Sequence, residues 1–388
     1  MSHHPASRLS QRATTSLKKH QQCSTSPHGY VSLGLADNSL MQEQLLQRMN
    51  TNADATVRCL SLGDTITGPV RLKTAIARFF NHYFHPAKHL QPSQLITTNG
   101  VTSAIEHCSW AISFGKDVSL RPAAKLVPVS FEGGDPLSVP AVSRYEDTIV
   151  RSGGQGCPIR AIMLCNSHNP LGRCYSRDEI YALSVWRHGQ DETTSVLSIE
   201  TDGIIDPSLV QVLWCVSKEF GSNGLRLEVV ISPGNPDLLE SVRDVGQYSS
   251  ISGLTDSLVA MVLEDEEFMD GYTRENGQRL AESYAYVVTF LDAHGIPFAR
   301  GSNAAFDVWC DLLTPYLRIQ PGYSPETSDV TTREASGELM QKLNSYKLHL
   351  GNGDDFGGEQ PGWFRITFSQ HREQLDEGLQ RIVRALHS

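Results

Sequence analysis

The chain has 388 residues and a formal net charge of −10, from 33 lysines and arginines against 43 aspartates and glutamates. This length fits one large domain and a smaller one, and 39% hydrophobic residues suffice for a buried core, which excludes disorder as the dominant state. The acidic balance argues against nucleic acid or an anionic membrane as a partner, because such partners need a basic surface. A small anionic ligand remains compatible with local positive charge.

Eight cysteines are scattered along the chain without a CxxC pair, which is typical of reduced thiols in a cytosolic protein and predicts no metal site. No stretch approaches the length of apolar sequence that spans a membrane, so we expect a cytoplasmic location. Residues 1–28 are predicted to form a disordered arm. The acid-free, basic composition that continues to residue 36 also resembles an organellar transit peptide, and both interpretations remain open.

The predicted elements begin with an extended piece at Tyr30–Leu35 and a helix around Met41–Met49. Arg71–Phe84 has the 3.6-residue apolar spacing of an amphipathic helix. A strand at Leu95–Thr98 leads through a turn to a helix at Val101–Phe114. Further strands are predicted at Lys125–Val129, Arg160–Cys165, Val196–Ile199, Leu209–Cys215 and Leu225–Ser232. Short β-branched runs that alternate with helices indicate an α/β fold with a mostly parallel sheet.

The last third of the chain has a different pattern. A long helix is predicted through Tyr272–His294. Two strands, Phe306–Leu312 and Phe364–Phe368, then alternate with two helices, Ser336–Tyr346 and Glu373–Leu386. This arrangement predicts a small C-terminal α+β domain.

Chemistry is concentrated in the stretch from Cys215 to Arg226. Lys218 directly follows an apolar strand, and a glycine-rich turn and Arg226 come after it. Small residues after a strand can bring backbone N–H groups and a guanidinium group to one phosphate. A lysine amine becomes nucleophilic when burial or a nearby cation lowers its pKa, which suits Schiff-base chemistry. A surface lysine after a strand is the alternative.

Two other stretches carry polar groups at the ends of predicted strands. Asn166–Gly172 follows an apolar strand, and in open parallel sheets ligands bind outside that end. Thr98–Glu106 joins a strand to the N-terminus of a helix, whose free N–H groups suit a phosphate. Each stretch is also compatible with an ordinary turn or helix cap, but their order along one α/β chain makes the combination more specific.

With these motifs the chain resembles the fold-type-I enzymes that use pyridoxal 5′-phosphate, in the class I/II aminotransferase group. It is most similar to the fungal branch of 1-aminocyclopropane-1-carboxylate synthase-like proteins. The resemblance extends from the Gly29–Asn38 stretch to Pro361–Phe368. It implies a large cofactor-binding domain at residues 61–270, a small domain at 271–388, and an N-terminal segment at 29–60 that packs on the small domain. It also implies a homodimer.

The resemblance assigns roles residue by residue. Lys218 would carry the cofactor as a Schiff base and move the substrate α-proton. Asn169 and Tyr181 would hydrogen-bond the phenolic oxygen of the cofactor, and Asp178 would pair with its pyridine nitrogen. An aspartate at that place keeps the ring protonated, so the ring can accept electrons from the substrate.

The same resemblance places the two anionic groups. The cofactor phosphate would be bound by Val101, Thr102, Ser217 and Arg226. Arg365 would hold the substrate carboxylate with two charge-assisted hydrogen bonds. The alternative for Arg365 is an ion pair with an acidic residue of the small domain.

The chain also departs from the family. Between Phe114 and Lys125, relatives have a longer segment that holds an aromatic residue stacked on the cofactor ring, and no aromatic residue is present here. Asn169 and Asp178 are nine positions apart, whereas the family places a helix and a strand between them. Glu228 lies where glycine is usual, and Ile66 lies where cyclopropane-forming members have tyrosine.

These observations predict a pyridoxal-phosphate-dependent enzyme of aminotransferase type that acts at the α-carbon of an amino acid or an amine derivative, in secondary metabolism. β-Elimination at a C–S bond is the close alternative, because it begins with the same deprotonation. A shortened relative without catalytic activity is the second class of hypothesis, since the two gaps weaken the site.

Overall fold

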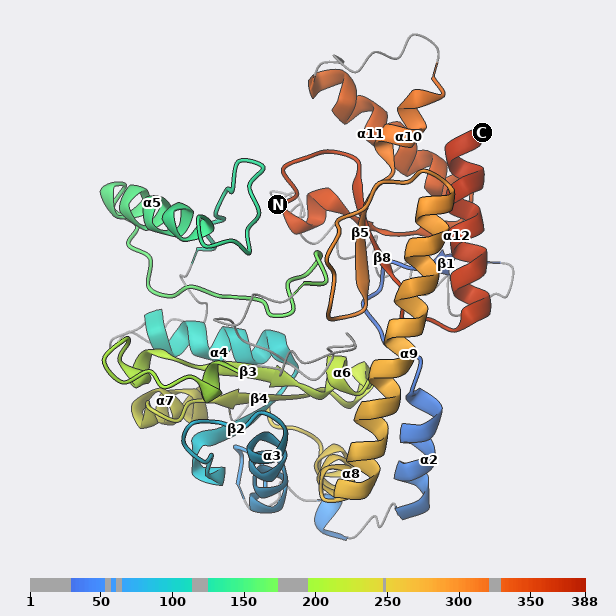
Figure 1. Cartoon of the computed structure of the whole chain (residues 1–388). Helices are drawn as coiled ribbons and strands as arrows, with labels where there is room; N and C mark the ends of the chain where they lie inside the picture. The colour runs from blue at the N-terminus through green and yellow to red at the C-terminus, as the bar shows by residue number, and fades with distance from the viewer. Residues whose placement is uncertain are drawn as a thin grey trace, which may run out of the picture.

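The computed structural model of the chain describes residues 29–52, 57–60, 65–113, 125–173, 195–246, 249–320 and 329–388. Figure 1 shows two groups of strands and helices, one around β2, β3 and β4 and the other around β5 and β8. The long helix α9 (Glu266–Ala293) runs from the first group to the second, so one continuous helix passes through the boundary expected at residues 270 and 271. None of the described helices is long and apolar enough to cross a bilayer.

The first sheet has the order β2-β4-β3, with β2 at Leu95–Asn99, β4 at Leu227–Ile231 and β3 at Val212–Cys215. The central strand β4 is antiparallel to both neighbours. The expectation of a mostly parallel sheet is therefore wrong for these described strands. The physical reason is the short connection Val216–Arg226 between β3 and β4, because a parallel crossover needs about a dozen or more residues.

Three predicted strands are absent from the described structure. Lys125–Val129 and Arg160–Cys165 have irregular backbone, and Val196–Ser198 forms a short 3-10 helix instead. No described strand pairs with the first two segments, and most of their apolar side chains are exposed, with Leu126 at 91% and Met163 at 61%. An apolar run becomes a strand only when a neighbour accepts its backbone hydrogen bonds.

Helices cover both faces of the first sheet, as the alternation of strand residues requires. Ile96 and Val230 face α4 (Val101–Ser113) and α7 (Pro236–Gly246). The opposite face packs against α3 (Val70–Tyr83), α8 (Gly253–Leu263) and α2 (Gln42–Asn52). The helices predicted near residues 41–49, 71–84 and 101–114 are confirmed as α2, α3 and α4.

The second sheet has the order β5-β8-β7 and is antiparallel. Its strands are β5 (Asp307–Asp311), β8 (Trp363–Thr367) and β7 (Gly351–Asn352), and its core includes apolar side chains of α9, α11 (Asp329–Ser345) and α12 (Arg372–His387). The small α+β unit predicted from the sequence is confirmed.

The N-terminal strand β1 (Val31–Ser32) pairs in parallel with β6 (Leu348–His349). This pairing brings the residues that follow β1 to the space between the two groups. The remaining helices are α5 (Ala141–Gly154), α6 (Val216–Glu219) and α10 (Leu313–Arg318).

Candidate functional site

Lys218 lies on the single-turn helix α6, directly after β3. Its Nζ donates a hydrogen bond to the Ala36 carbonyl oxygen at 2.6 Å and lies 5.9 Å from the centre of the Phe306 ring. Although the side chain is accessible to solvent, desolvation by the surrounding protein lowers its pKa. The positive charges of Arg365 and Arg226 lower this pKa further, and the negative charges of Asp307 and Asp37 oppose them. The environment therefore favours the neutral, nucleophilic amine.

Arg365 lies on β8 in the second sheet, and its side chain is buried. Nη1 donates to Asn169 Oδ1 at 2.8 Å, and Nη2 donates to the Gly34 carbonyl oxygen at 2.6 Å. Its Nε lies 3.5 Å from Asp307 Oδ1, and the guanidinium carbon lies 4.7 Å from the centre of the Phe356 ring. The structure thus forms the ion pair with a small-domain acid that the sequence left as an alternative.

The segment after β1 connects the two halves of the site. Its carbonyl oxygens at Gly34 and Ala36 accept hydrogen bonds from Arg365 and Lys218. The next residue, Asp37, accepts a hydrogen bond from Asn223 Nδ2 at 3.0 Å, in the turn that follows α6. The four-residue stretch Gly34–Asp37 therefore contacts the lysine, the arginine and the glycine-rich turn together.

The other end of the site is the N-terminus of α4. Gly100 precedes this helix with φ of 88°, and a Cβ there would lie 2.1 Å from Arg226 Nη2. The Arg226 guanidinium group therefore lies against Gly100, beside the first turn of α4. Thr102 is exposed on that turn. Backbone N–H groups, a hydroxyl and a guanidinium group form the donor set that a phosphate requires.

Glu228 occupies the same end of the site. It is 2% exposed, its Oε1 accepts a hydrogen bond from Ser217 Oγ at 3.1 Å, and its carboxylate also accepts one from the Val101 N–H. Its Oε2 is buried without a hydrogen-bond partner among the described residues. Burial raises the pKa of Glu228 to about 8, which the Val101 N–H bond opposes. Two of the predicted phosphate-binding residues are thus already bonded to a carboxyl group of the chain.

The structure brings most of the sequence-predicted site residues together in two connected clusters. Lys218, Arg365 and Asn169 form one, and Arg226, Ser217 and the start of α4 form the other. Asp178 and Tyr181 lie outside the described residues, as do residues 114–124 and 174–177, where the two gaps were predicted.

Sequence reasoning missed two contributors to the site. Asp307 begins a strand whose next three residues, Val308–Cys310, are apolar, and an acid beside such a run is a signal for a buried ion pair that could have been used. The Gly34 and Ala36 carbonyl oxygens carried no signal, because any residue provides them.

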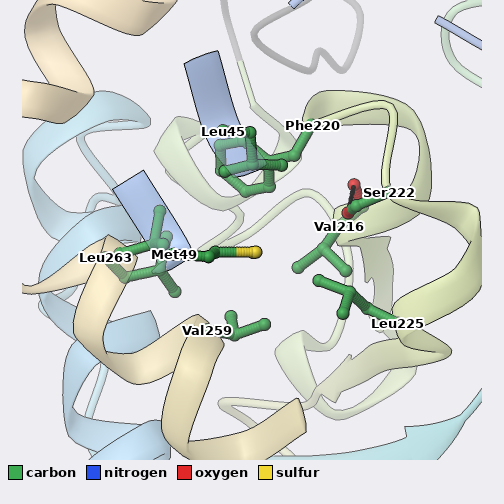
Figure 2. A pocket seen from close by; sticks show the side chains of 9 residues that line it. Leu45, Met49, Val216, Phe220, Ser222, Leu225, Val259 and Leu263 are labelled. Atoms are coloured by element: carbon green, nitrogen blue, oxygen red, sulfur yellow. Dashed lines mark hydrogen bonds between the residues drawn. The ribbon is translucent and has the colours of Figure 1, made fainter. Parts of the chain in front are cut away.

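A separate small pocket lies in the core of the first group of elements. Figure 2 shows that its lining is apolar apart from Ser222, with Leu45 and Met49 facing Val216 and Val259. It contains none of the predicted site residues. Its lining belongs almost entirely to the buried cluster behind the sheet and to side chains packed against it, so it is an imperfection of core packing and carries no chemistry.

The fold and this lysine-centred site define a class of pyridoxal-phosphate enzymes, and comparison with known proteins agrees. The model of the family "Aminotransferase class I and II" matches residues 140–382, which is more than half of the chain. The chain therefore belongs to the class I and II aminotransferases. It is an aminotransferase-like member with fold type I, and its cofactor is pyridoxal 5′-phosphate.

Individual relatives cover almost the whole chain. "Probable aminotransferase gliI" of Aspergillus fumigatus is 29% identical over 393 aligned positions, which include 91% of this chain and 88% of that protein. "1-aminocyclopropane-1-carboxylate synthase-like protein 1" of Bos taurus is 28% identical over 93% of this chain and 76% of that protein. The aspartate aminotransferase of Rhizobium meliloti has a similar fold, with a TM-score of 0.67 at 16% identity, over 100% of this chain and 99% of that chain.

The length of the first alignment is informative. It has 393 positions, more than the 388 residues of the whole chain, so it includes positions that have no counterpart here. The relative therefore contains residues that this chain lacks. The positions of the two gaps stay predictions.

Proposed function

We propose that the chain catalyses transamination at the α-carbon of an amino acid or a related amine in secondary metabolism. The observation that carries this proposal is the convergence of Lys218 and Arg365 on one site, with the N-terminal segment bonded to both. When bound, the cofactor supplies an electron sink for the substrate α-carbon. The chain's own residues then position the substrate and move its proton.

Lys218 is the residue that we propose attaches the cofactor and transfers the α-proton. Its lowered pKa leaves a larger fraction of neutral amine near neutral pH, which both tasks require. In the described structure Nζ is held by the Ala36 carbonyl oxygen, so this hydrogen bond must break before the amine reacts. Asn169 would orient the phenolic oxygen of the cofactor, and Asp178 and Tyr181 would complete the ring site.

Arg365 is the residue that we propose binds the substrate carboxylate. Both of its terminal nitrogens already donate hydrogen bonds, to Asn169 and to Gly34. Each terminal nitrogen carries a second N–H that a substrate carboxylate could use. However, the buried Asp307 charge beside Nε reduces the attraction for a second carboxylate. The site therefore has a weaker preference for α-carboxylates than an unpaired arginine would have.

The experiment is a borohydride reduction of the protein with pyridoxal 5′-phosphate, followed by peptide mapping and a half-reaction assay with a panel of amino acids and amines. We expect the label on Lys218 and keto-acid release without loss of a sulfur leaving group. Labelling at another lysine would contradict the proposal. Release of a thiol with the keto acid would assign β-elimination instead.

A second candidate function, a relative without turnover, is favoured by two observations. Glu228 is bonded to the proposed phosphate donors, and the apolar segments at residues 125–129 and 160–165 lack strand partners in the described structure. The half-reaction assay separates the candidates, because such a relative would bind cofactor without converting any substrate.

We also propose a cytoplasmic homodimer. The six described cysteines with free thiols, Cys59, Cys108, Cys157, Cys165, Cys215 and Cys310, support a reducing compartment. Light scattering of the purified chain tests the dimer, and localisation of a tagged chain tests the compartment.

A further inference from the structure

The cluster formed by Glu228, Ser217 and the N-terminus of α4 is unusual for an anion site. An anion site presents donors that are free to bind the ligand. Here the Ser217 hydroxyl and the Val101 N–H both donate to the Glu228 carboxylate. A phosphate at this position would need the same donors and would place its negative charge against that carboxylate.

Glu228 cannot leave this position easily. It lies on the central strand β4, between Thr98 of β2 and Cys215 of β3, and the side chain is almost completely buried. The residues on both sides of it in β4 are buried as well. The carboxyl group therefore has to be accommodated together with the phosphate.

We propose that Glu228 controls cofactor binding, such that the phosphate binds at the N-terminus of α4 only when the Glu228 carboxyl group is protonated. This inference rests on the proposed function of the cluster as the phosphate site. In the neutral form the repulsion disappears, and Oε2, which is buried without a partner among the described residues, gains an O–H that can donate to a phosphate oxygen. Each phosphate bound by the ionised form takes up one proton from solvent.

The surroundings of Glu228 support a proton-linked step at accessible pH. Burial raises its pKa to about 8, and the opposing contribution is the Val101 N–H bond. No charged side chain is among the causes of this shift. The titratable or charged residues on the described elements around it are Cys215 on β3, Lys218 and Glu219 on α6, Arg226 before β4, and Glu106, His107 and Cys108 on α4.

The test compares pyridoxal 5′-phosphate with pyridoxal, which lacks the phosphate. Both aldehydes react with Lys218, so the ratio of their dissociation constants isolates the contribution of the phosphate from the titration of the lysine. The ratio is measured near pH 7 and near pH 9 by fluorescence titration, for the unmodified chain and for Glu228→Gln.

We expect Glu228→Gln to bind the phosphorylated aldehyde about tenfold more tightly than the unmodified chain near pH 9, because only about a tenth of Glu228 is protonated there. The advantage should shrink to less than about twofold near pH 7. Pyridoxal should bind both proteins equally. Glu228→Gly, which removes the side chain altogether, should show the same loss of pH dependence if Glu228→Gln folds poorly.

Glu219→Gln is the matched control. Glu219, on α6, is another buried glutamate, but it lines a small pocket with Tyr272 and Asn276, away from α4. We expect this variant to keep the pH dependence of the unmodified chain. The proposal would be overturned if the ratio of dissociation constants were equal in the unmodified chain and Glu228→Gln at both pH values. It would also be overturned if Glu219→Gln lost the pH dependence of this ratio in the same way as Glu228→Gln. Failure of every protein to bind either aldehyde at Lys218 would instead overturn the proposed function, and this inference with it.

Discussion

Arg365 and Asp307 form a buried ion pair at the centre of the site, with Arg365 Nε 3.5 Å from Asp307 Oδ1 and both side chains at most 6% exposed. Asp307 also accepts a hydrogen bond from Thr367 Oγ1 at 2.7 Å. Burial raises the pKa of Asp307, although Arg365, Thr367 and Lys218 favour its charged form. The positive charge of Arg365, which we propose binds the substrate, is thus partly neutralised by Asp307 of the same small domain.

Asp307→Asn should therefore separate stability from ligand binding. Removal of one partner leaves the Arg365 charge uncompensated in the interior, so we expect the free energy of unfolding to fall by about 3 kcal/mol. The same change should tighten the binding of a carboxylate substrate, which can supply the missing negative charge. Chemical denaturation with and without a dicarboxylate measures both effects. Thr367→Val, which removes only the hydrogen bond to Asp307, is the control and should not tighten ligand binding.

Arg365→Lys should weaken amino-acid binding by about tenfold to a hundredfold, because a lysine cannot reproduce charge-assisted bonds that two nitrogens make. Cofactor binding should stay unchanged. Arg372→Lys, at an exposed arginine paired with Asp376 on α12, is the matched control. Loss of cofactor together with substrate in Arg365→Lys would show that the arginine only holds Asn169 and the N-terminal segment in place.

The pH dependence of stability provides a third prediction. The pKa of Glu228 is about 8 in the folded chain and near 4.5 in the unfolded chain, so the folded state binds more protons between these values. Its contribution is fully present below about pH 4.5 and is lost as the pH rises toward 8. We expect the thermal midpoint of Glu228→Gln, relative to that of the unmodified chain, to rise as the pH increases from about 4.5 to about 8 and then to level off. A constant difference across pH 5 to 9 would show that folding does not raise the pKa of Glu228.

Much of this fold follows from local patterns in the sequence. The amphipathic spacing of Val70–Tyr83 and the short β-branched run in Leu95–Asn99 each indicate the correct element. The segments at residues 125–129 and 160–165 have equally apolar sequences and are not strands. The difference depends on a pairing partner elsewhere in the chain, which local sequence does not encode.

The functional site, like the fold, can be predicted only in part from local sequence. Four site residues are recognisable because their motifs have a fixed spacing and chemistry. They are Lys218, Asn169, Arg226 and Arg365. The contacts that modify them come from distant residues, such as the Ala36 carbonyl oxygen on Lys218 and Asp307 on Arg365. Since the free energy of an ion pair depends on distance and burial, its effect on substrate preference requires the three-dimensional arrangement.

The final prediction concerns the two gaps. A chimera that carries the corresponding segments of the Aspergillus fumigatus relative between residues 114 and 125 and between residues 170 and 178 should bind the cofactor more tightly than the unmodified chain. Stacking of a ring on an aromatic side chain contributes about 1–3 kcal/mol, so the first segment alone should lower the dissociation constant by about one to two powers of ten.

The second segment should act on stability as well as on chemistry. Leu126, Ile162, Met163 and Leu164 are exposed in the described structure, and strand partners for these segments would bury them. We therefore expect a higher thermal midpoint in the chimera and measurable turnover in the half-reaction assay. A chimera with only the first segment should gain affinity for the cofactor without the gain in stability. Tight cofactor binding and rapid turnover by the unmodified chain would contradict this prediction, because its site would then be complete without these segments.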